Sequence, residues 1–508
     1  MKIQLIQPPQ FDFGKNRRFL EEGPIVTYTM PVGLGYLASM LENAGHEVNI
    51  VDAYCMKSPW QELEEKIKKF SPEVIGITSL SDQRASCYQL IRLIKSIGSR
   101  IKVVLGGHHP TLMFEQILQK FPVDAVVLGE GEVTMVELVK AWQENKEIDE
   151  INGIAFCKNQ KIIKTDPREM ISNLDTIPFP AYHLIDISAY KGWHFIDQIF
   201  SLLGRGTRDY QQASLITSRG CPGKCSFCSV RQMWGPKWRK RSPHNVVDEI
   251  EMLYKKYNVE FFVFADDIFS VDQKRVMSIC EEILQRGIKI DWGFQTAVKF
   301  VSSDMLNLAA KAGCKAVIYG VESASETILK KISKNITVDQ IINAFELTKN
   351  AGMLTGAYLM VGNIGEDRIT IRETIKLLKV IKPDIIVPQI LMICPGTELF
   401  EIAKSQNFIN DNYWLSDLPL PYYTYEHDLY TLSRWYRELG YWHVSRLDRL
   451  LRILRDVIEL KTGIRITKEG IRRVTPIPPA SPPYTGSKGY LMDNPKLFLS
   501  DNLICSKG

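Results

Sequence analysis

Residues 218–228 read Ser-Arg-Gly-Cys-Pro-Gly-Lys-Cys-Ser-Phe-Cys and place three thiols, Cys221, Cys225 and Cys228, at C-x3-C-x2-C spacing. Soft thiolates this close in sequence can fold around one metal centre. A structural zinc site normally uses four protein ligands, and the segment offers only three thiols and no histidine. Three incidental or zinc-bound thiols are therefore the weaker interpretation, and the spacing favours an iron–sulfur cubane with one iron left for a substrate.

The sequence around these cysteines alternates strands and helices. Apolar runs typical of buried parallel strands recur every 25 to 50 residues or so. These runs are Ala213–Thr217, Phe261–Ala265, Ile290–Gln295, Ala316–Val321, Gly356–Val361 and Ile385–Ile393. The rhythm predicts an open or partial (β/α)6 TIM-type barrel over residues 213–400, with the cysteine loop directly after its first strand.

The three cysteines, with Phe227 before the last, resemble the cluster motif of the radical S-adenosylmethionine (SAM) enzymes. The resemblance covers roughly residues 213–400. It implies a [4Fe-4S] cluster whose free iron chelates the amino and carboxylate groups of SAM. It also implies that one electron cleaves SAM to a 5′-deoxyadenosyl radical.

Polar residues after successive strands extend this resemblance. The pair Asp266-Asp267 ends the second predicted strand, where family members more often carry Gly-Gly-Glu. Taken alone, each carboxylate could equally cap a helix or lie in a solvated loop, but after successive strands such residues favour one site. The resemblance implies that SAM is bound by Phe227, Asp266, Asp267, Gln295, Glu322, Ser323 and Gly362.

Residues 1–145 show the same alternation and predict a doubly wound, Rossmann-like α/β domain. The predicted strands are Lys2–Ile6, Glu47–Val51, Val74–Thr78, Lys102–Leu105 and Ala125–Leu128. Ligands of such sheets lie beyond the carboxyl ends of the strands. Two glycine-containing loops occur there, Gly106–Pro110 after the fourth run and Gly129–Glu132 after the fifth.

The layout of this region resembles the cobalamin-binding domain of the class B radical SAM methylases. The matching stretches are Pro8-Pro9, Pro31–Ala38 and Gly45–Asp52, together with the two glycine loops. Glycines there let the backbone approach a large flat ligand. The resemblance implies that cobalamin is bound by Gly33, Asp52, Thr78, Ser79, Ser81, Gly106, Gly107, His108, Gly129, Glu130, Gly131 and Glu132.

Two features of this region bear on the identity of the ligand. The D-x-H-x-x-G motif of many cobalamin proteins is missing from the sequence, so we expect cobalt without a protein imidazole below it; His108 and His109 could equally cap their loop. Residues 33–38 also fit the G-x-G-x-x-A dinucleotide fingerprint, with Asp52 as the ribose-binding acid. That fingerprint must follow its strand directly, whereas 26 residues separate Ile6 from Gly33, so NAD is the weaker hypothesis.

Two regions are less regular. Residues 146–212 have the character of a linker, with a possible hairpin between Gly153–Cys157 and Lys161–Lys164. Residues 401–508 are predicted to be mainly helical, basic and then Pro-rich, and to carry substrate specificity. Within them, residues 446–459 form a helical pattern whose arginines could be a solvated face, or could bind an acidic substrate, a partner or a lipid headgroup.

Composition is that of an ordinary globular protein, with 45% hydrophobic and 24% charged residues in 508. The formal net charge of +5 (63 Lys and Arg against 58 Asp and Glu) does not indicate a nucleic-acid binder. Ten cysteines are too few for a disulfide scaffold, and no apolar run is long enough for a membrane helix. We expect a cytoplasmic monomer; the family resemblance implies a flavodoxin or ferredoxin as electron donor.

Together the two resemblances imply a cobalamin-dependent radical SAM C-methyltransferase. Such an enzyme abstracts a substrate hydrogen with the 5′-deoxyadenosyl radical and transfers a methyl group from methylcobalamin to the unactivated carbon radical. The substrate could be a peptide or protein residue or a small metabolite. One alternative is a non-methylating relative, such as an oxidative cyclase or a ring-contracting enzyme. The other is a cobalamin-binding sensor whose cluster is regulatory.

Overall fold

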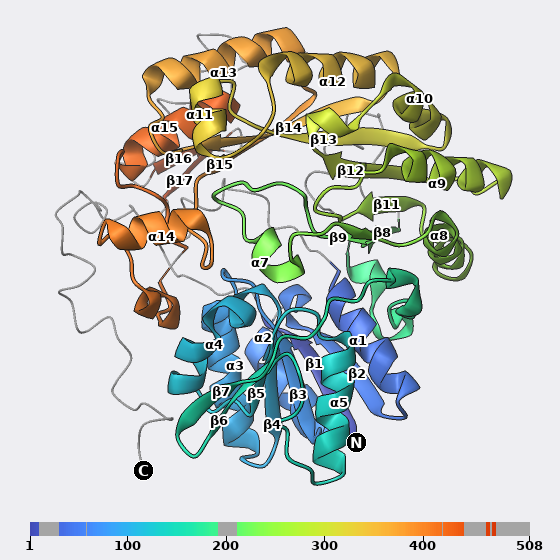
Figure 1. Cartoon of the computed structure of the whole chain (residues 1–508), viewed down its shortest axis with the longest axis vertical. Helices are drawn as coiled ribbons and strands as arrows, with labels where there is room; N and C mark the ends of the chain where they lie inside the picture. The colour runs from blue at the N-terminus through green and yellow to red at the C-terminus, as the bar shows by residue number, and fades with distance from the viewer. Residues whose placement is uncertain are drawn as a thin grey trace.

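The computed structural model describes residues 1–9, 30–56, 58–190, 211–418, 420–440, 464–467 and 470–473 (Figure 1). Two largely parallel sheets dominate it, and the predicted α/β class, a doubly wound domain followed by a partial barrel, is confirmed. The helix predicted over residues 446–459 lies outside the described residues, as does the Pro-rich stretch after it.

The first sheet has seven strands in the order β2-β1-β3-β4-β5-β6-β7. They are β1 Lys2–Gln7, β2 Glu47–Asp52, β3 Val74–Thr78, β4 Lys102–Gly106, β5 Ala125–Val127, β6 Ile154–Lys158 and β7 Lys161–Lys164. Strands β1 to β5 are parallel, and their order reverses between β1 and β3. At such a switch point two loops diverge to opposite faces and leave room for a ligand beyond the strand ends.

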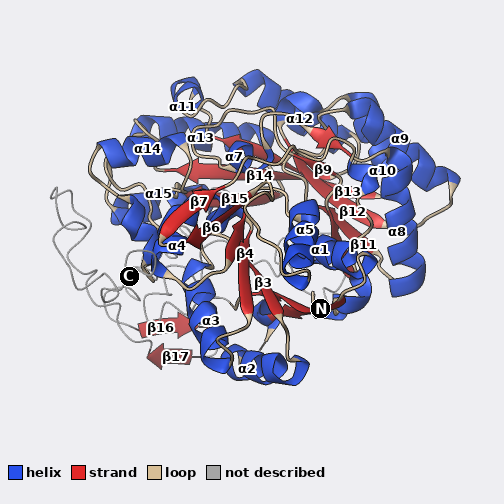
Figure 2. Cartoon of the chain, turned by 60° about the horizontal axis from the view of Figure 1, so that its bottom comes forward, coloured by secondary structure: helices blue, strands red, loops and turns tan. Residues whose placement is uncertain are grey.

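Helices cover both faces of this sheet. They are α1 Val32–Asn43, α2 Pro59–Phe70, α3 Arg84–Ile97, α4 His108–Lys120 and α5 Glu132–Gln143. Figure 2 shows α1 and α5 on one side of the strands and α2 and α3 on the other. The central strands are therefore buried on both faces, which explains their continuous apolar sequences.

The predicted hairpin forms and joins the first sheet. Strand β6 pairs antiparallel with β5, and β7 pairs antiparallel with β6. The hairpin therefore extends the sheet of the first domain. In the part of the following segment that the structure describes, residues 165–190, the helical elements are 3-10 turns at Leu174–Thr176, Tyr182–Leu184 and Ile187–Ala189. The domain boundaries at residues 145, 212 and 400 remain predictions.

The second sheet has six parallel strands in the order β15-β14-β13-β12-β11-β8. They are β8 Gln212–Leu215, β11 Phe261–Phe264, β12 Asp291–Thr296, β13 Cys314–Glu322, β14 Leu354–Val361 and β15 Ile385–Ile390. Each predicted strand of the barrel is thus present. Neighbours in sequence are neighbours in the sheet, as a partial (β/α)6 barrel requires.

Helices connect these strands, and Figure 1 shows α12 and α13 on the side of the sheet away from the first domain. The helices are α8 Pro243–Tyr257, α9 Gln273–Gln285, α10 Ser303–Lys311, α11 Glu326–Lys331, α12 Val338–Asn350 and α13 Arg368–Ile381. The short elements β9 Ser218–Arg219, α7 Val230–Trp234 and β10 Arg239–Lys240 lie between the two sheets. After the barrel come α14 Glu398–Ser405, a 3-10 helix Asp411–Leu415, α15 Leu429–Gly440 and the hairpin β16 Ile464–Thr467 with β17 Gly470–Arg473.

Alternating side chains build the barrel core on both faces of the strands. In β11, Phe261 and Val263 belong to a small apolar cluster on one face, together with residues of β13 and β15. Phe262 and Phe264 belong to the main core on the other face. Since successive residues of a strand point to opposite faces, one apolar run serves both cores. The second sheet is thereby packed on both faces, and this packing holds the ends of its strands in place.

Candidate active site between the two sheets

The cysteine loop leaves the carboxyl end of β8 through the short strand β9. Its entry requires Gly220, whose φ is +90° and whose added Cβ would lie 2.7 Å from the carbonyl oxygen of Lys237. Ser226 then holds the loop from both sides. Its N–H donates to the carbonyl of Ile332 (3.1 Å), and its carbonyl accepts from the N–H of Leu399 (3.0 Å). The loop is therefore anchored to the barrel and to α14.

The three thiols of this loop are all half-buried. An added Cβ at Gly223 would lie 3.2 Å from the sulfur of Cys221 and 3.9 Å from that of Cys225, so glycine keeps the space between these thiols clear. Burial raises the pKa of each thiol, that of Cys228 to about 12. A bound metal must therefore drive their deprotonation, because the thiolate is the ligand.

The donor set suits a cluster better than a single ion. Within the described ranges, no three His, Cys, Asp or Glu side chains are arranged around one metal ion. In a four-iron cluster each thiolate binds a different iron, so the sulfurs must stand farther apart than around one ion. Three half-buried thiols on one anchored loop fit that arrangement.

The two predicted aspartates after β11 have different environments. Asp266 is fully buried and accepts hydrogen bonds from the N–H and hydroxyl of Thr217 (3.1 and 3.0 Å) and from the hydroxyl of Ser218. Its carboxylate thus joins β11 to β9. Burial, with Asp266 beside it, raises the pKa of Asp267 to about 6. Asp267 also lies close enough to Cys221 and Cys228 to act on their titration, so it is the aspartate that faces the cysteine loop.

The next strand ends bring polar side chains toward the same loop. Gln295 donates to the carbonyl of Asp266 (3.0 Å) and accepts from the hydroxyl of Tyr358 (3.2 Å). Glu322 ends β13 with a left-handed φ of 63° and pairs with Lys334 at 2.9 Å. A non-glycine residue rarely adopts this backbone conformation, which marks the position as strained.

Lys334 and Tyr358 were not predicted from the sequence. The Lys334 ammonium is largely buried, and its pKa is raised by Glu322 and by Cys225 against the effect of desolvation. It thus lies within electrostatic reach of the cysteine loop. Lys334 follows α11 in the sequence and belongs to no local motif. Only the packing of α11 beneath the cysteine loop identifies it as a site residue. Tyr358 lies inside a strand and reaches the site only because β14 neighbours β13.

The other predicted SAM residues contribute mainly to local structure. Ser323 is fully buried, and its hydroxyl accepts from the N–H of Ser325 (3.2 Å). Gly362 has a φ of +87°, and its N–H donates to Glu366 (2.7 Å). Phe227 is half-buried and packs against the main core. These residues shape the rim of the site.

The loops after β3 and β4 lie together at the carboxyl edge of the first sheet. The N–H of Ser79 donates to the carbonyl of Gly106, and the N–H of His109 donates to the carbonyl of Ser79, each at 3.1 Å. Gly107 has a φ of +90°, and an added Cβ would lie 2.9 Å from the hydroxyl of Thr78. Only glycine fits here, which lets the loops after β3 and β4 lie close together.

The two histidines of this loop have different surroundings. His109 is buried, with Nδ1 3.1 Å from the hydroxyl of Ser81 and Nε2 2.9 Å from the hydroxyl of Tyr88. Burial lowers the pKa of His109 to about 3, so the ring is neutral. His108 lies edge-on to Trp234, with ring centroids 6.0 Å apart. Trp234 ends α7, which begins two residues after Cys228, so the cysteine loop and this loop meet directly.

The remaining residues predicted to bind cobalamin are three glycines and three carboxylates. Gly33 is exposed near the start of α1, and an added Cβ would meet nothing within 4 Å. Asp52 instead accepts a hydrogen bond from the hydroxyl of Tyr190 (2.6 Å), and Glu130 and Glu132 pair with Arg219. Around them, Gly129 adopts a φ of +72°, and Gly131 packs close to Leu37. The three carboxylates are thus engaged by the chain itself.

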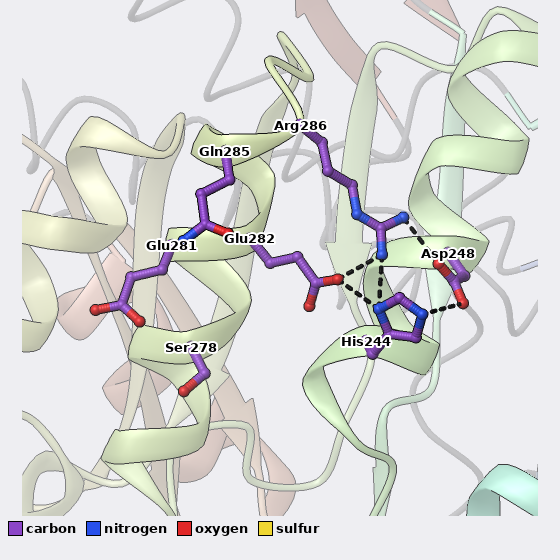
Figure 3. A pocket seen from close by; sticks show the side chains of 7 residues that line it. All are labelled: His244, Asp248, Ser278, Glu281, Glu282, Gln285 and Arg286. Atoms are coloured by element: carbon purple, nitrogen blue, oxygen red, sulfur yellow. Dashed lines mark hydrogen bonds and ion pairs between the residues drawn. The ribbon is translucent and has the colours of Figure 1, made fainter.

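A surface pocket on α8 and α9 lies elsewhere (Figure 3). His244 contacts Glu282 at 2.7 Å, and Arg286 contacts Asp248 at 2.8 Å. This pocket is lined by His244, Asp248, Ser278, Glu281, Glu282, Gln285 and Arg286. It contains no predicted site residue and lies on the outer helices, so it is not the active site.

Comparison with known proteins identifies both halves. Residues 24–139 match the B12 binding domain family, and residues 215–378 match the Radical SAM superfamily. The combination defines an enzyme that uses a [4Fe-4S] cluster, SAM and cobalamin. A protein of Pyrococcus horikoshii named as an uncharacterized methyltransferase is 33% identical over 82% of this chain and 85% of its own length. The chain therefore belongs to the cobalamin-dependent radical SAM enzymes, of the class B methyltransferase type.

Two further proteins illustrate the range of these relatives. The anaerobic magnesium-protoporphyrin IX monomethyl ester cyclase of Rubrivivax gelatinosus is 32% identical over 73% of this chain and 66% of its own length. The solved radical SAM methyltransferase TsrM of Kitasatospora setae has a TM-score of 0.66 at 19% identity, over 80% of this chain and 76% of that one. The latter likeness establishes the shared fold. Among the described residues, none of the helices is long and apolar enough to cross a membrane.

Proposed function

We propose that this enzyme transfers a methyl group to an unactivated carbon of its substrate. The observation that carries the proposal is the contact of Trp234 with His108, which joins the cysteine loop to the predicted corrin loop. When bound, the cluster and SAM supply one-electron hydrogen abstraction, and cobalamin supplies a transferable methyl group. The chain's own task is to hold these groups in line and to keep them apart from bulk water.

The residues around the cysteine loop have separable roles in this proposal. Cys221, Cys225 and Cys228 hold the cluster. Asp267 and Lys334 offer a carboxylate and an ammonium beside it, which complement the two charged ends of an amino acid. They are our choice for the residues that orient the methionine part of SAM. Gln295 supports them through the Asp266 carbonyl.

The first domain holds cobalamin, in our proposal, through backbone rather than through a metal ligand. The loop around Ser79 and the Gly106-Gly107 turn form its support. Both ring nitrogens of His109 are hydrogen-bonded, so this imidazole cannot bind cobalt without breaking a buried network. This supports the expectation that His109 does not bind cobalt.

A second candidate is a reaction with the same cofactors but without methyl transfer. The 32% identity to the Rubrivivax cyclase favours it. The substrate, a peptide or protein residue or a small metabolite, stays open in both cases. The cytoplasmic site of action, the monomeric state and the flavodoxin or ferredoxin donor also remain predictions. Membership of an enzyme family argues against the sensor alternative.

Anaerobically reconstituted protein distinguishes these candidates. We would add cobalamin, dithionite and SAM and measure 5′-deoxyadenosine and methylcobalamin by chromatography. Both products are expected from a methyltransferase, and 5′-deoxyadenosine alone would favour the cyclase-type reaction. Neither product from protein with full iron and cobalamin would refute the proposal.

Two variants control this experiment. Cys225→Ser should lose most of its bound iron and 5′-deoxyadenosine formation, by about tenfold or more, because one thiolate ligand is removed. Cys280→Ser alters a thiol buried in α9, away from the cysteine loop, and should retain both iron and product. Equal iron in the two variants would count against the assigned cluster loop.

A further inference from the structure

A buried ion-pair network joins the two domains beside the active site. Arg219 of β9 places Nη1 2.7 Å from Glu130 and Nη2 2.5 Å from Glu132. The side chains of Arg219, Glu130 and Glu132 are 5%, 3% and 7% exposed. Arginine's planar fork can contact two carboxylates at once, and here it does so away from water.

Neighbouring groups complete the network. Arg239 of β10, paired directly with Arg219 across the two-stranded sheet, places Nη1 2.8 Å from Glu130. The second oxygen of Glu130 accepts from the N–H of Ile171 (2.8 Å). Two arginines thus balance two glutamates, which is the arrangement that makes buried charge tolerable.

Aromatic rings fix the position of the Arg219 guanidinium. Its central carbon lies 5.6 Å from the centroid of the Tyr36 ring and 5.3 Å from that of the Trp234 ring. Tyr36 belongs to α1 of the first domain, and Trp234 ends α7, directly after the cysteine loop. The guanidinium therefore contacts both domains through its stacking as well as through its charge.

The positions of these residues in the sequence show which two loops the network connects. Arg219 is two residues before Cys221, whereas Glu130 lies in the loop after β5 and Glu132 is the first residue of α5, with Gly131 between them. One end thus continues into the cluster ligands, and the other belongs to a strand-end loop of the corrin-binding sheet. A shift of either loop must break charge contacts that water cannot replace.

We propose that Arg219 is a positioning residue that sets the distance and orientation of the cysteine loop relative to the Gly129–Glu132 loop, and hence of the two cofactors. The inference rests on the proposed function for its purpose, and on the contacts above for its existence. Buried ion pairs seldom stabilise a protein more than apolar residues of the same shape would. They do fix one geometry, because any displaced arrangement leaves a buried charge unpaired.

The test compares the same substitution at two ion-paired glutamates. Glu132→Gln weakens the pair that spans the domains. Glu251→Gln weakens the pairs of Glu251 with Lys255 of α8 and with Arg286 at the end of α9, both within the barrel domain. Arg219→Lys, which keeps the charge but loses the fork, is the second variant at the network. Each full-length protein is loaded with cluster and cobalamin and examined by hydrogen-exchange mass spectrometry.

We expect Glu132→Gln and Arg219→Lys to speed amide exchange in both loops, residues 129–132 and 220–228, by about tenfold or more. Glu251→Gln should speed exchange around α8 and leave both loops at the wild-type rate. A second readout is the spin relaxation of cob(II)alamin caused by the reduced cluster, which depends steeply on their separation. It should change in the two network variants and not in Glu251→Gln.

Two results would overturn the proposal. One is unchanged exchange in both loops of the network variants; the other is an increase no larger than that in Glu251→Gln, which would reduce the network to general stabilisation. Failure of the proposed function is a separate observation, because hydrogen exchange requires no methyl transfer. Loops that respond to these substitutions in a protein without methylation activity would leave the positioning role intact.

Discussion

Gly107 illustrates how one residue shapes the predicted corrin surface. Its φ of +90° and the 2.9 Å approach to the Thr78 hydroxyl impose two separate demands on the position. Gly45 has a φ of +85° but nothing within 4 Å of an added Cβ, so it imposes only the first. Gly107 therefore combines backbone strain with crowding, whereas Gly45 has no crowding.

We therefore expect Gly107→Ala to cost more than Gly45→Ala. A positive φ should cost Gly45→Ala about 1 kcal/mol of unfolding free energy. Gly107 also has a ψ of −172°, a conformation almost restricted to glycine, so its backbone should cost about 1–3 kcal/mol and crowding about 1–3 kcal/mol more. Gly107→Ala should also weaken cobalamin binding, while Gly45→Ala should not. Urea unfolding and cobalamin titration measure the two effects. Equal losses in the two variants would contradict the role given to the Thr78–Gly107 contact.

Glu366 makes the stability of the folded protein depend on pH. Burial raises its pKa from 4.5 to about 7, although the N–H groups of Gly362 and Asn363 oppose the shift. The folded protein therefore binds the proton more tightly than the unfolded chain does. Stability falls as pH rises between these two values, and the loss is complete above the folded pKa.

Glu366→Gln should remove this loss, since the amide is uncharged and its oxygen can still accept from Gly362. We expect the stability of the wild type relative to the variant to fall by about 2 kcal/mol between roughly pH 5 and pH 8. Urea unfolding of both proteins across this range measures it. Parallel pH profiles would show that Glu366 does not titrate as described.

Helix α15 is docked on the barrel through one buried face. Leu432 is fully buried and contacts the Gly362 turn, where an added Cβ would lie 3.2 Å from both of its methyl carbons. Tyr430, on the same helix, is 63% exposed. The buried face of α15 therefore lies on the loop after β14, and Glu438 fixes the helix further through an ion pair with Arg368.

We expect Leu432→Ala to lower the unfolding free energy by about 3 kcal/mol through the cavity it leaves. Tyr430→Ala should change it by less than about 0.5 kcal/mol. Thermal and urea unfolding of the two variants provide the comparison. A small effect at both positions would mean that α15 is not docked on the Gly362 turn.

The parallel strands were predictable because they are buried on both faces and so have nearly continuous apolar sequences. The partners of an element were harder to predict. The β6–β7 hairpin was expected from its turn, but its addition to the edge of the first sheet depends on the free side of β5. Likewise Tyr358 reaches the site only through the neighbouring position of β14.

At the scale of the whole molecule, a carboxy-terminal segment reaches back to the first domain. The hydroxyl of Tyr88 in α3 donates to the carbonyl of Trp414 (3.0 Å) and accepts from Nε2 of His109 (2.9 Å). Arg84 also donates to the carbonyl of Leu418. One hydrogen-bonded chain thus connects the segment after the barrel with the predicted corrin loop.

Tyr88→Phe should release this segment. Its matched control is Tyr319→Phe, which removes a hydroxyl bonded to Thr348 inside the barrel (2.6 Å). Both variants should lose about 1–2 kcal/mol of stability. Only Tyr88→Phe should speed hydrogen exchange in residues 411–418. Protection of that segment in Tyr88→Phe equal to the wild type would argue against the connection.

The sequence by itself determined the fold class and the cysteine loop, and its resemblance to a known family implied the cofactors. These depend on local signals: apolar runs, spacing of thiols, and glycines at turns. Such signals can be read from the sequence because each involves residues only a few positions apart.

Only the tertiary structure decided which partners the predicted carboxylates have within the chain. Asp266, Asp52, Glu130 and Glu132 were all predicted to contact a cofactor, yet each is engaged by residues far away in the chain. Lys334, without any motif, is brought to the cysteine loop. The physical reason is that a buried charge must find its partner in space, and a single sequence does not reveal which partner the fold supplies.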